Sequence, residues 1–342
     1  MMLSRFGRLT VRCSIAAALL AGCGGSQPPI GAPGANPQTY ALAHQLSNSD
    51  QPLLYVFGSY GSSNGKILDY PSGTTVSEFV PKPSEFVRTC SDSEGNVYLA
   101  GADETSGEYP AISEYTYGAT SPSNYVVVTS QEYGDAVGCS VDPTTGNIAM
   151  IAEVPEKAVD VFAPQLQGTP QTFDSSMPWL LSAGYDNSGN LFLLGLSGHY
   201  QLEFAELPKG GSSFEAMSLD LGSHAPNKPG DGNDIGWTVE WDGQYVTIEG
   251  AYSPKHNGKP KTWKQAIYRL NISGSAATVA QTIFLRQPFV FNAAYWITPT
   301  LNSILVTKGS VREFDYPGGR RIGKLQLGGQ SDLSTIALPP SR

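Results

Sequence analysis

A four-residue pattern that ends in a large apolar residue, usually aromatic, occurs six times in this chain. The end residues of successive copies lie 45, 47, 42, 66 and 44 positions apart. Self-similarity at a period in the forties, in strand-like sequence, is typical of the blades of a β-propeller. The six copies are Ile67–Tyr70, Ile112–Tyr115, Val159–Phe162, Gln201–Phe204, Ile267–Leu270 and Val311–Phe314.

Each copy lies between two turns. A turn such as Asp92–Asn96 or Asp186–Asn190 leads into an apolar strand before the pattern, and a turn such as Pro71–Gly73 follows it. Asp, Pro, Gly and Asn favour tight turns, and a wholly apolar strand is typical of one covered on both faces. A fourth, more polar strand follows the second turn, as at Thr75–Val80. We therefore predict four antiparallel strands in each unit.

The count of inner strands predicts how the ring closes. Five of them begin before the apolar strands, whereas six strands end in the repeated pattern. The segment Asp332–Pro339 can supply the sixth inner strand by pairing with Leu53–Phe57, which would hide the open edges of the first unit. The predicted fold is all-β: a six-bladed β-propeller of four-stranded blades over residues 51–342. The five inner strands are expected to start near Glu85, Asp135, Trp179, Asp234 and Asn292.

The repeated cycle resembles that of exported bacterial propeller proteins of the broad NHL and YVTN type. Asp92–Ala100, Asp186–Leu194 and Tyr70–Gly73 carry the resemblance, which extends over residues 53–339 in degenerate form. It implies a fold that serves binding, scaffolding and several enzyme chemistries, so the resemblance does not identify a ligand.

The first 22 residues have the features of an export signal. Three arginines precede a short apolar core, Ile15–Leu20, which is too short to span a bilayer. The following Leu20–Cys23 resembles the lipobox of bacterial lipoproteins, which implies cleavage before Cys23 and lipid attachment to it. A general secretion signal with a chance cysteine is the alternative. Gly24, in place of an aspartate, favours the outer membrane if the organism has one.

Residues 23–50 are predicted to be a flexible tether, because they are rich in Gly, Pro, Ser, Gln and Asn. A flexible chain of that length spans about 30 Å. Removal of residues 1–22, with three arginines and no acidic residue, takes the formal net charge from −9 to −12. This charge argues against nucleic acid or anionic lipid as the main partner. We expect a monomeric propeller that meets the membrane through its lipid.

Two cysteines, Cys90 and Cys139, remain in the folded part. An oxidising compartment would permit a disulfide between them. Their positions relative to the following turns differ by one residue, and this offset favours two separate buried thiols.

Polar residues recur near the start of the inner strands and form the first candidate site. If they surround the mouth of the central channel, their oxygen atoms would suit Ca²⁺, although no cofactor is required by the pattern. The alternative is that polar residues mark the place where each strand leaves solvent. The candidates are Glu85, Asp135, Asp234, Asn292 and Asp332.

The segment Phe291–Trp296 is loosely similar to the metal-binding units of gluconolactonase-type lactonases. That resemblance implies a divalent metal held by Glu, Asn and Asp in the channel, and a hydrolase. At the position of the family's asparagine, however, this chain has mainly apolar residues. A metal-dependent hydrolase is therefore the alternative to a binding or scaffolding module. The departing residues are Val87, Val137, Leu181, Ala294 and Ser334.

A lysine-rich insertion lies within the 66-residue gap of the repeat. It suits a docking loop for an anionic partner, such as an envelope polysaccharide or an acidic protein, with a tryptophan as anchor. A solvated hairpin extension is the alternative. The residues are Lys255, Lys259, Lys261, Trp263 and Lys264.

Overall fold

The chain divides into two units, Met1–Asn36 and Pro37–Arg342, and every described residue belongs to the second. The predicted signal peptide, Cys23 and the tether lie outside the described residues. Within the described residues, no helix has the length and apolarity needed to cross a membrane. The computed structural model describes residues 51–58, 64–83, 85–103, 105, 109–129, 136–152, 158–224, 237–252, 255–256, 259–260, 264–288, 294–298, 303–307, 309–327 and 333–337.

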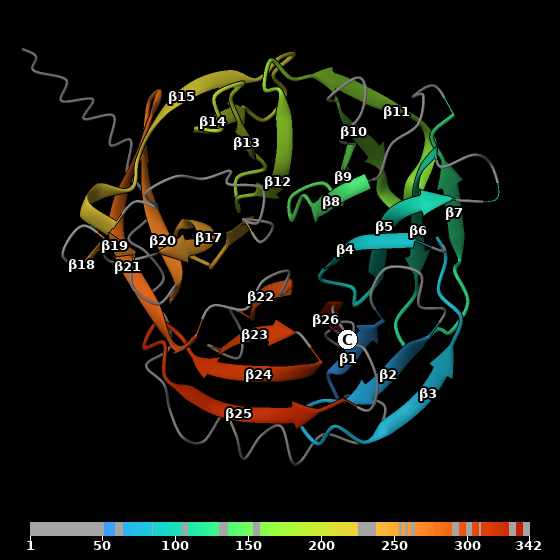
Figure 1. The fold of residues 1–342 in the computed structure, drawn as a ribbon. Helices are drawn as coiled ribbons and strands as arrows, with labels where there is room; N and C mark the ends of the chain where they lie inside the picture. Colours follow the sequence, from blue (N-terminus) through green and yellow to red (C-terminus); the bar gives the residue numbers. More distant parts are fainter. Residues whose placement is uncertain are drawn as a thin grey trace, which may run out of the picture. The chain divides into compact units, whose positions relative to one another are not determined.

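The first three units are four-stranded antiparallel sheets that run from an inner to an outer strand (Figure 1). The first unit takes its inner strand from the C-terminal part of the chain: Leu333–Ala337 (β26), Leu53–Phe57 (β1), Gly65–Asp69 (β2) and Thr75–Phe79 (β3). The second consists of Glu85–Ser91 (β4), Val97–Asp103 (β5), Tyr109–Tyr115 (β6) and Asn124–Val127 (β7). The third consists of Ala136–Val141 (β8), Ile148–Ala152 (β9), Ala158–Ala163 (β10) and Gln167–Asp174 (β11).

The fourth and fifth units share one eight-stranded sheet, because their outer strands β15 and β21 pair in parallel. The fourth consists of Trp179–Tyr185 (β12), Leu191–Leu196 (β13), Leu202–Leu207 (β14) and Glu215–Asp220 (β15). The fifth consists of Thr238–Trp241 (β16), Val246–Tyr252 (β17), Lys264–Ser273 (β20) and Ala276–Pro288 (β21). The sixth consists of Ala294–Thr298 (β22), Ser303–Thr307 (β23), Ser310–Asp315 (β24) and Arg321–Gln326 (β25).

Three small elements lie between these strands. A two-stranded sheet of Lys255–His256 (β18) and Lys259–Pro260 (β19) occupies the insertion of the fifth unit. Short 3-10 helices occupy Pro164–Leu166 (η1) and Gly222–His224 (η2).

The inner strands form a closed ring. Each contacts the next in the order β26, β4, β8, β12, β16, β22, and β22 contacts β26 again (Figure 1). The described strands thus make six four-stranded units around one axis, as the sequence repeat predicts. The predicted closure is also confirmed, because β1 pairs antiparallel with β26 from Leu53↔Ala337 to Phe57↔Leu333.

Apolar clusters between neighbouring units form the core. The residues that end the repeated pattern all lie in these clusters and are at most 5% exposed, which explains why the repeat requires a large apolar side chain there. They are Tyr70, Tyr115, Phe162, Phe204, Leu270 and Phe314.

The recurring aspartates of the repeat build the turns after the inner strands. In four units, an aspartate Oδ1 accepts the backbone N–H two residues later, at distances of 2.8–2.9 Å. An acceptor at this place fixes a tight turn. These aspartates, Asp92, Asp142, Asp186 and Asp242, therefore have a structural role.

Cys90 and Cys139 form a disulfide, and the expectation of two separate thiols is wrong. Their Cα atoms are 5.7 Å apart, on the contacting inner strands β4 and β8. These strands belong to different sheets, so no backbone hydrogen-bond register ties one to the other. Alignment on the turns therefore does not determine the relative height of residues on neighbouring inner strands, and a one-residue offset does not prevent the bond.

Candidate functional site

A cavity of about 280 Å³ lies between the inner strands β4, β8, β12, β16 and β22. Its volume is close to the lower end of the ~300–1,000 Å³ that is typical of small-molecule sites. The wall combines charged and aromatic side chains, among them Arg88, Glu240, Tyr185, Trp241, Tyr295 and Trp296.

Side chains that accept backbone N–H groups brace the wall of the cavity. Ser140 Oγ on β8 accepts the N–H of Tyr185 on β12 at 3.0 Å. Ser182 Oγ on β12 accepts the N–H of Val239 on β16 at 2.9 Å. Each of these bonds joins two sheets that share no backbone ladder at the inner strands, so the wall is held in one arrangement.

Two glutamates lie on the face of the fifth unit that meets the sixth. The register pairs Glu240 with Thr247 and Glu249 with Thr238, which places both glutamates on one face of the β16–β17 hairpin. Glu240 Oε2 accepts the N–H of Ile297 on β22 at 2.7 Å. Glu249 is 1% exposed, and its Oε1 accepts a hydrogen bond from Gln265 Nε2 at 2.8 Å.

Burial raises the pKa of Glu240 to about 8, although the Ile297 N–H acts in the opposite direction. Burial also raises the pKa of Glu249 to about 8, against the hydrogen bond from Gln265 and the positive charge of Arg88. The pKa of Arg88 is lowered by burial, while both glutamates oppose that change. Within the described part of the chain, Arg88 makes no ion pair with either carboxyl group.

Three buried polar atoms in this region have no hydrogen-bond partner among the described residues. They are Arg88 Nε, Glu249 Oε2 and Tyr295 Oη. A buried polar atom without a partner typically costs about 1–3 kcal/mol, so native proteins contain few of them. Arg88 and Tyr295 line the cavity, and Glu249 pairs in register with the lining residue Thr238, so this cavity is the strongest candidate for a ligand site.

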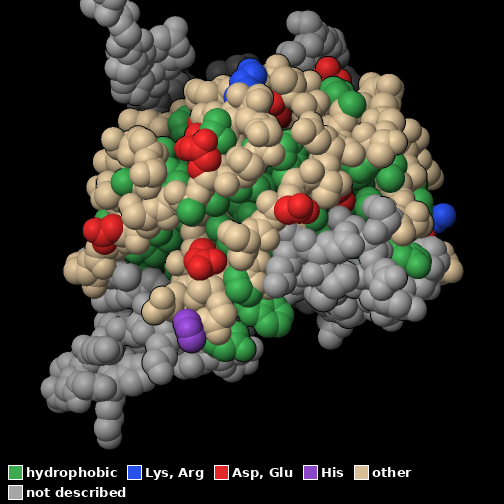
Figure 2. Space-filling model, turned by 90° about the horizontal axis from the view of Figure 1, so that it is seen from above, with side chains coloured by type: hydrophobic (Ala, Val, Ile, Leu, Met, Phe, Trp, Pro, Cys, Tyr) green, Lys and Arg blue, Asp and Glu red, His purple; other side chains and the backbone are tan. Residues whose placement is uncertain are grey.

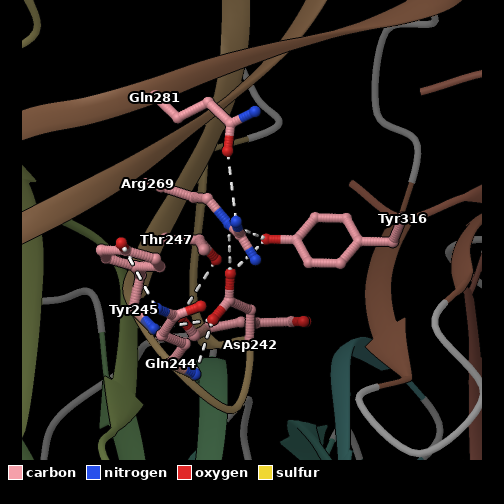
Figure 3. Close-up of polar contacts among 8 residues, drawn as sticks. Asp242, Gln244, Tyr245, Thr247, Arg269, Gln281 and Tyr316 are labelled. Carbon is pink, nitrogen blue, oxygen red and sulfur yellow. Dashed lines mark hydrogen bonds and ion pairs between the residues drawn. The ribbon is translucent and has the colours of Figure 1, made fainter. Parts of the chain in front are cut away.

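A second polar cluster, centred on Arg269, lies nearby between the fifth and sixth units (Figure 3). Arg269 Nε donates to Asp242 Oδ2 at 2.7 Å, and the Tyr316 hydroxyl donates to the same oxygen. The guanidinium lies 4.9 Å from the ring centroids of both Tyr245 and Tyr316. Since these contacts satisfy one another, we assign this cluster a structural role.

The visible side of the molecule in Figure 2 carries Asp and Glu side chains one by one among apolar and neutral residues. Lys and Arg side chains are sparse among the described residues on that side. This agrees with the acidic composition, for which a clustered basic surface is not expected.

The channel-mouth candidates from the sequence fall outside the side chains that the structure describes. Glu85 begins β4, but its side chain is not among those described, and Asp135, Asp234, Asn292 and Asp332 lie outside the described residues. Within the described part, no three His, Cys, Asp or Glu side chains form a group that could hold a metal ion.

The docking-loop candidates are described only in part. Lys255 lies in β18 and Lys259 in β19, while Lys261 and Trp263 lie outside the described residues. Lys264 begins β20, and its Nζ lies 5.8 Å from the centroid of the Phe284 ring.

Sequence reasoning did not find Arg88, Glu240, Glu249 or Tyr295. The available signal was a single glutamate inside each of two otherwise uncharged strands, in Thr238–Trp241 and Val246–Tyr252. A lone acid in a strand that packs between sheets requires a partner or a ligand.

No family model matches this chain, and no curated protein matches it. Three solved structures are similar to it over most of their length. A chain of the nidogen/laminin complex has a TM-score of 0.58 and 12% identity, covering 85% of this chain and 100% of that one. A protein of unknown function from Bacteroides caccae has a TM-score of 0.55 and 12% identity, covering 84% and 99%. Hydrazine synthase from Kuenenia stuttgartiensis has a TM-score of 0.50 and 10% identity, covering 85% and 90%. At these identities the likeness shows the architecture alone: this chain is a β-propeller.

Proposed function

We propose that this chain is an exported bacterial lipoprotein that acts as a binding module at the cell envelope, with the central cavity as its ligand site. The export and lipid signals in residues 1–23 support the location, and the flexible composition of residues 24–50 supports a tether. In this proposal, the lipid on Cys23 anchors the propeller to the inner or the outer membrane.

The observation that carries the binding function is the cavity with its incompletely satisfied polar wall. A ring that served only as a rigid scaffold would gain stability from an apolar or fully hydrogen-bonded centre. Here a guanidinium nitrogen, a carboxyl oxygen and a phenol oxygen have no partner among the described residues. A ligand that supplies the missing partners explains why these groups are present.

The lysine-rich insertion adds a second contact surface to this proposal. Its cationic residues suit an anionic envelope polysaccharide or an acidic protein. The rest of the chain is acidic and would repel such a partner, so the insertion is the favoured place for contact.

Membrane anchoring is tested with Cys23→Ala in a bacterial host. We expect wild type to incorporate radiolabelled palmitate and to fractionate with membranes. The variant should incorporate none, and it should keep its uncleaved signal peptide. Incorporation of palmitate by the variant at the wild-type level would contradict the lipid anchor.

The cavity is tested by native mass spectrometry of the full chain purified from envelopes in mild detergent. We expect wild type to carry a small molecule that Thr89→Trp loses, because Thr89 lines the cavity and the larger ring would fill it. The matched control is Thr75→Trp on the outer strand β3, where the side chain is exposed. Retention of the same ligand by Thr89→Trp would refute the cavity as its site.

A divalent-metal-dependent hydrolase of the lactonase type is the second candidate. Trp179, the first residue of β12, occupies the position that aligns with the channel-mouth acids of the other inner strands. It is 43% exposed, so the start of this inner strand is open to solvent. Titration calorimetry with CaCl₂ on wild type and Asp135→Ala tests it. Absence of binding heat in wild type would end the Ca²⁺ hypothesis.

A further inference from the structure

We propose that the central cavity binds a small organic cation, such as a protonated amine, with Glu240 and Tyr295 as its polar contacts and with the charge of Glu249 close behind the wall. This inference rests on the proposed binding function and adds the chemical class of the ligand. It stands on the geometry of the cavity wall and on the charges that meet there.

Two carboxyl groups and one guanidinium group meet beside the cavity, so their charges do not balance when both carboxyl groups are ionised. Glu240 comes from β16 and Glu249 from β17, while Arg88 reaches the same region from β4 of another unit. If both carboxyl groups are ionised, Arg88 neutralises only one of them. A buried charge without compensation is costly, so the ionised pair is short of one positive charge, which either a proton or a bound cation can supply. A ligand with a single ammonium group supplies that charge.

The second argument is the set of unpartnered atoms. Tyr295 is 5% exposed and lines the cavity, and its hydroxyl has no partner among the described residues. Glu249 Oε2 also has no hydrogen-bond partner among the described residues, and Glu249 is 1% exposed. An ammonium group donates up to three hydrogen bonds, and the carboxyl group of Glu240 and the hydroxyl of Tyr295, which both line the cavity, can accept them.

The third argument is the aromatic wall. Trp241, Trp296, Tyr185 and Tyr295 all line the cavity. Aromatic faces attract organic cations, whereas Ca²⁺ requires about 6–8 oxygen ligands. The described residues include no group of three acids, histidines or cysteines that could hold a metal ion. The wall therefore favours an organic cation over a metal ion.

Binding of a cation should replace a proton. The charged and titratable groups that face Glu240 and Glu249 are Arg88 and Tyr295, and the two glutamates also face each other. Tyr295 interacts in addition with Asp242 and Tyr316. Because both carboxyl groups have a pKa of about 8, the empty cavity holds protons at neutral pH. The affinity for an ammonium ion should rise by about tenfold per pH unit below pH ~8 for each proton that binding displaces, and should level off above that pH.

The experiment is titration calorimetry on the full chain in detergent, with ethylammonium and putrescine as probes. Measurements in phosphate at pH about 6.5 and in borate at pH about 8.5 bracket the titration of the pair. N-acetylglucosamine serves as the probe of the neutral-sugar class, and CaCl₂, titrated in cacodylate instead of phosphate to avoid precipitation, as the probe of the metal class. We expect one or both amines to bind, with an affinity about tenfold or more higher at the upper pH.

Three variants separate the site from a general effect on folding. Glu240→Gln keeps an acceptor for the Ile297 N–H but removes the charge, and Tyr295→Phe removes only the hydroxyl. We expect each to weaken amine binding, Glu240→Gln by about tenfold or more with loss of the pH dependence. Glu215→Gln, at an exposed position of β15, should bind as wild type does. Thermal unfolding of each variant verifies that it is folded.

Each outcome decides the proposal. Amine binding that Glu240→Gln weakens and Glu215→Gln does not would support it. Amine binding that is independent of pH or unchanged in Glu240→Gln overturns it, as does the failure of both amines to bind. Binding of the sugar or of Ca²⁺ instead overturns the organic cation but leaves the cavity as a ligand site. The proposed function itself is overturned only if wild type carries no ligand in native mass spectra or if Thr89→Trp retains the same ligand.

Discussion

The Asp242–Arg269 pair should be one of the most costly polar contacts to break, and Arg269→Met tests this directly. The Asp242 side chain is 0% exposed and that of Arg269 is 13% exposed, so removal of the cation leaves a carboxylate without its charge partner inside the protein (Figure 3). Breaking a buried pair in this way typically costs about 3–5 kcal/mol. Methionine preserves most of the apolar stem, so the loss reports mainly on the guanidinium.

The contacts that remain set the expected magnitude. Asp242 keeps the Tyr316 hydroxyl and the backbone N–H groups of Gln244 and Tyr245, at 2.8 and 2.7 Å. These donors reduce the cost, whereas loss of the guanidinium between the two tyrosine rings adds about 0.5–1 kcal/mol. We therefore expect a decrease of about 3–4 kcal/mol in the free energy of unfolding.

The assay is urea unfolding followed by tryptophan fluorescence at neutral pH, with Lys66→Met as the matched control. Lys66 pairs with Glu78 at 2.9 Å, but the two side chains are 30% and 65% exposed. An exposed pair typically contributes about 0–1 kcal/mol, and salt screens it. A loss below about 1 kcal/mol in Arg269→Met, or a loss equal to that of Lys66→Met, would refute the reasoning.

Three further predictions concern stability. Since burial raises the pKa of Glu249 from 4.5 to about 8, the folded protein holds a proton that the unfolded chain releases. The free energy of unfolding should therefore decrease as the pH rises from about 4.5 to about 8. Urea unfolding at several pH values should show a smaller decrease for Glu249→Gln than for wild type. Reduction of the Cys90–Cys139 disulfide, whose residues are 49 positions apart, should cost about 2–4 kcal/mol, measured with and without reductant. Gly184→Ala should cost about 1–3 kcal/mol in thermal unfolding, because the added Cβ would lie 2.6 Å from the carbonyl oxygen of Val239. An unchanged unfolding midpoint would contradict this and would mean that the two strands move apart without cost.

Much of the architecture could be predicted from the sequence, because the repeat reflects a local physical requirement. Residues such as Tyr115 and Phe314 must fill the space between two sheets, and aspartates such as Asp92 must close a turn. Both requirements recur in each unit and therefore appear as a period. The pairing of β1 with β26 followed from the same count, since one inner strand was missing.

The cavity could not be predicted in the same way. Arg88, Glu240 and Tyr295 come from three different units, and only the closure of the ring brings them together. No spacing along the chain encodes this arrangement, because it depends on the relative stagger of units that share no backbone ladder at their inner strands. The same stagger explains why the one-residue offset between Cys90 and Cys139, measured from the following turns, led to the wrong prediction of two separate thiols.

The pairing of β1 with β26 has a consequence for biogenesis. Leu53 is among the first residues of the folded part to be synthesised, and its partner Ala337 is among the last. Until β26 has been synthesised, the first sheet lacks its inner strand, and the unpaired edge of β1 can pair with a strand of another chain. Pairing of β26 with β1 then closes that edge, so the last strand of the fold completes the first sheet.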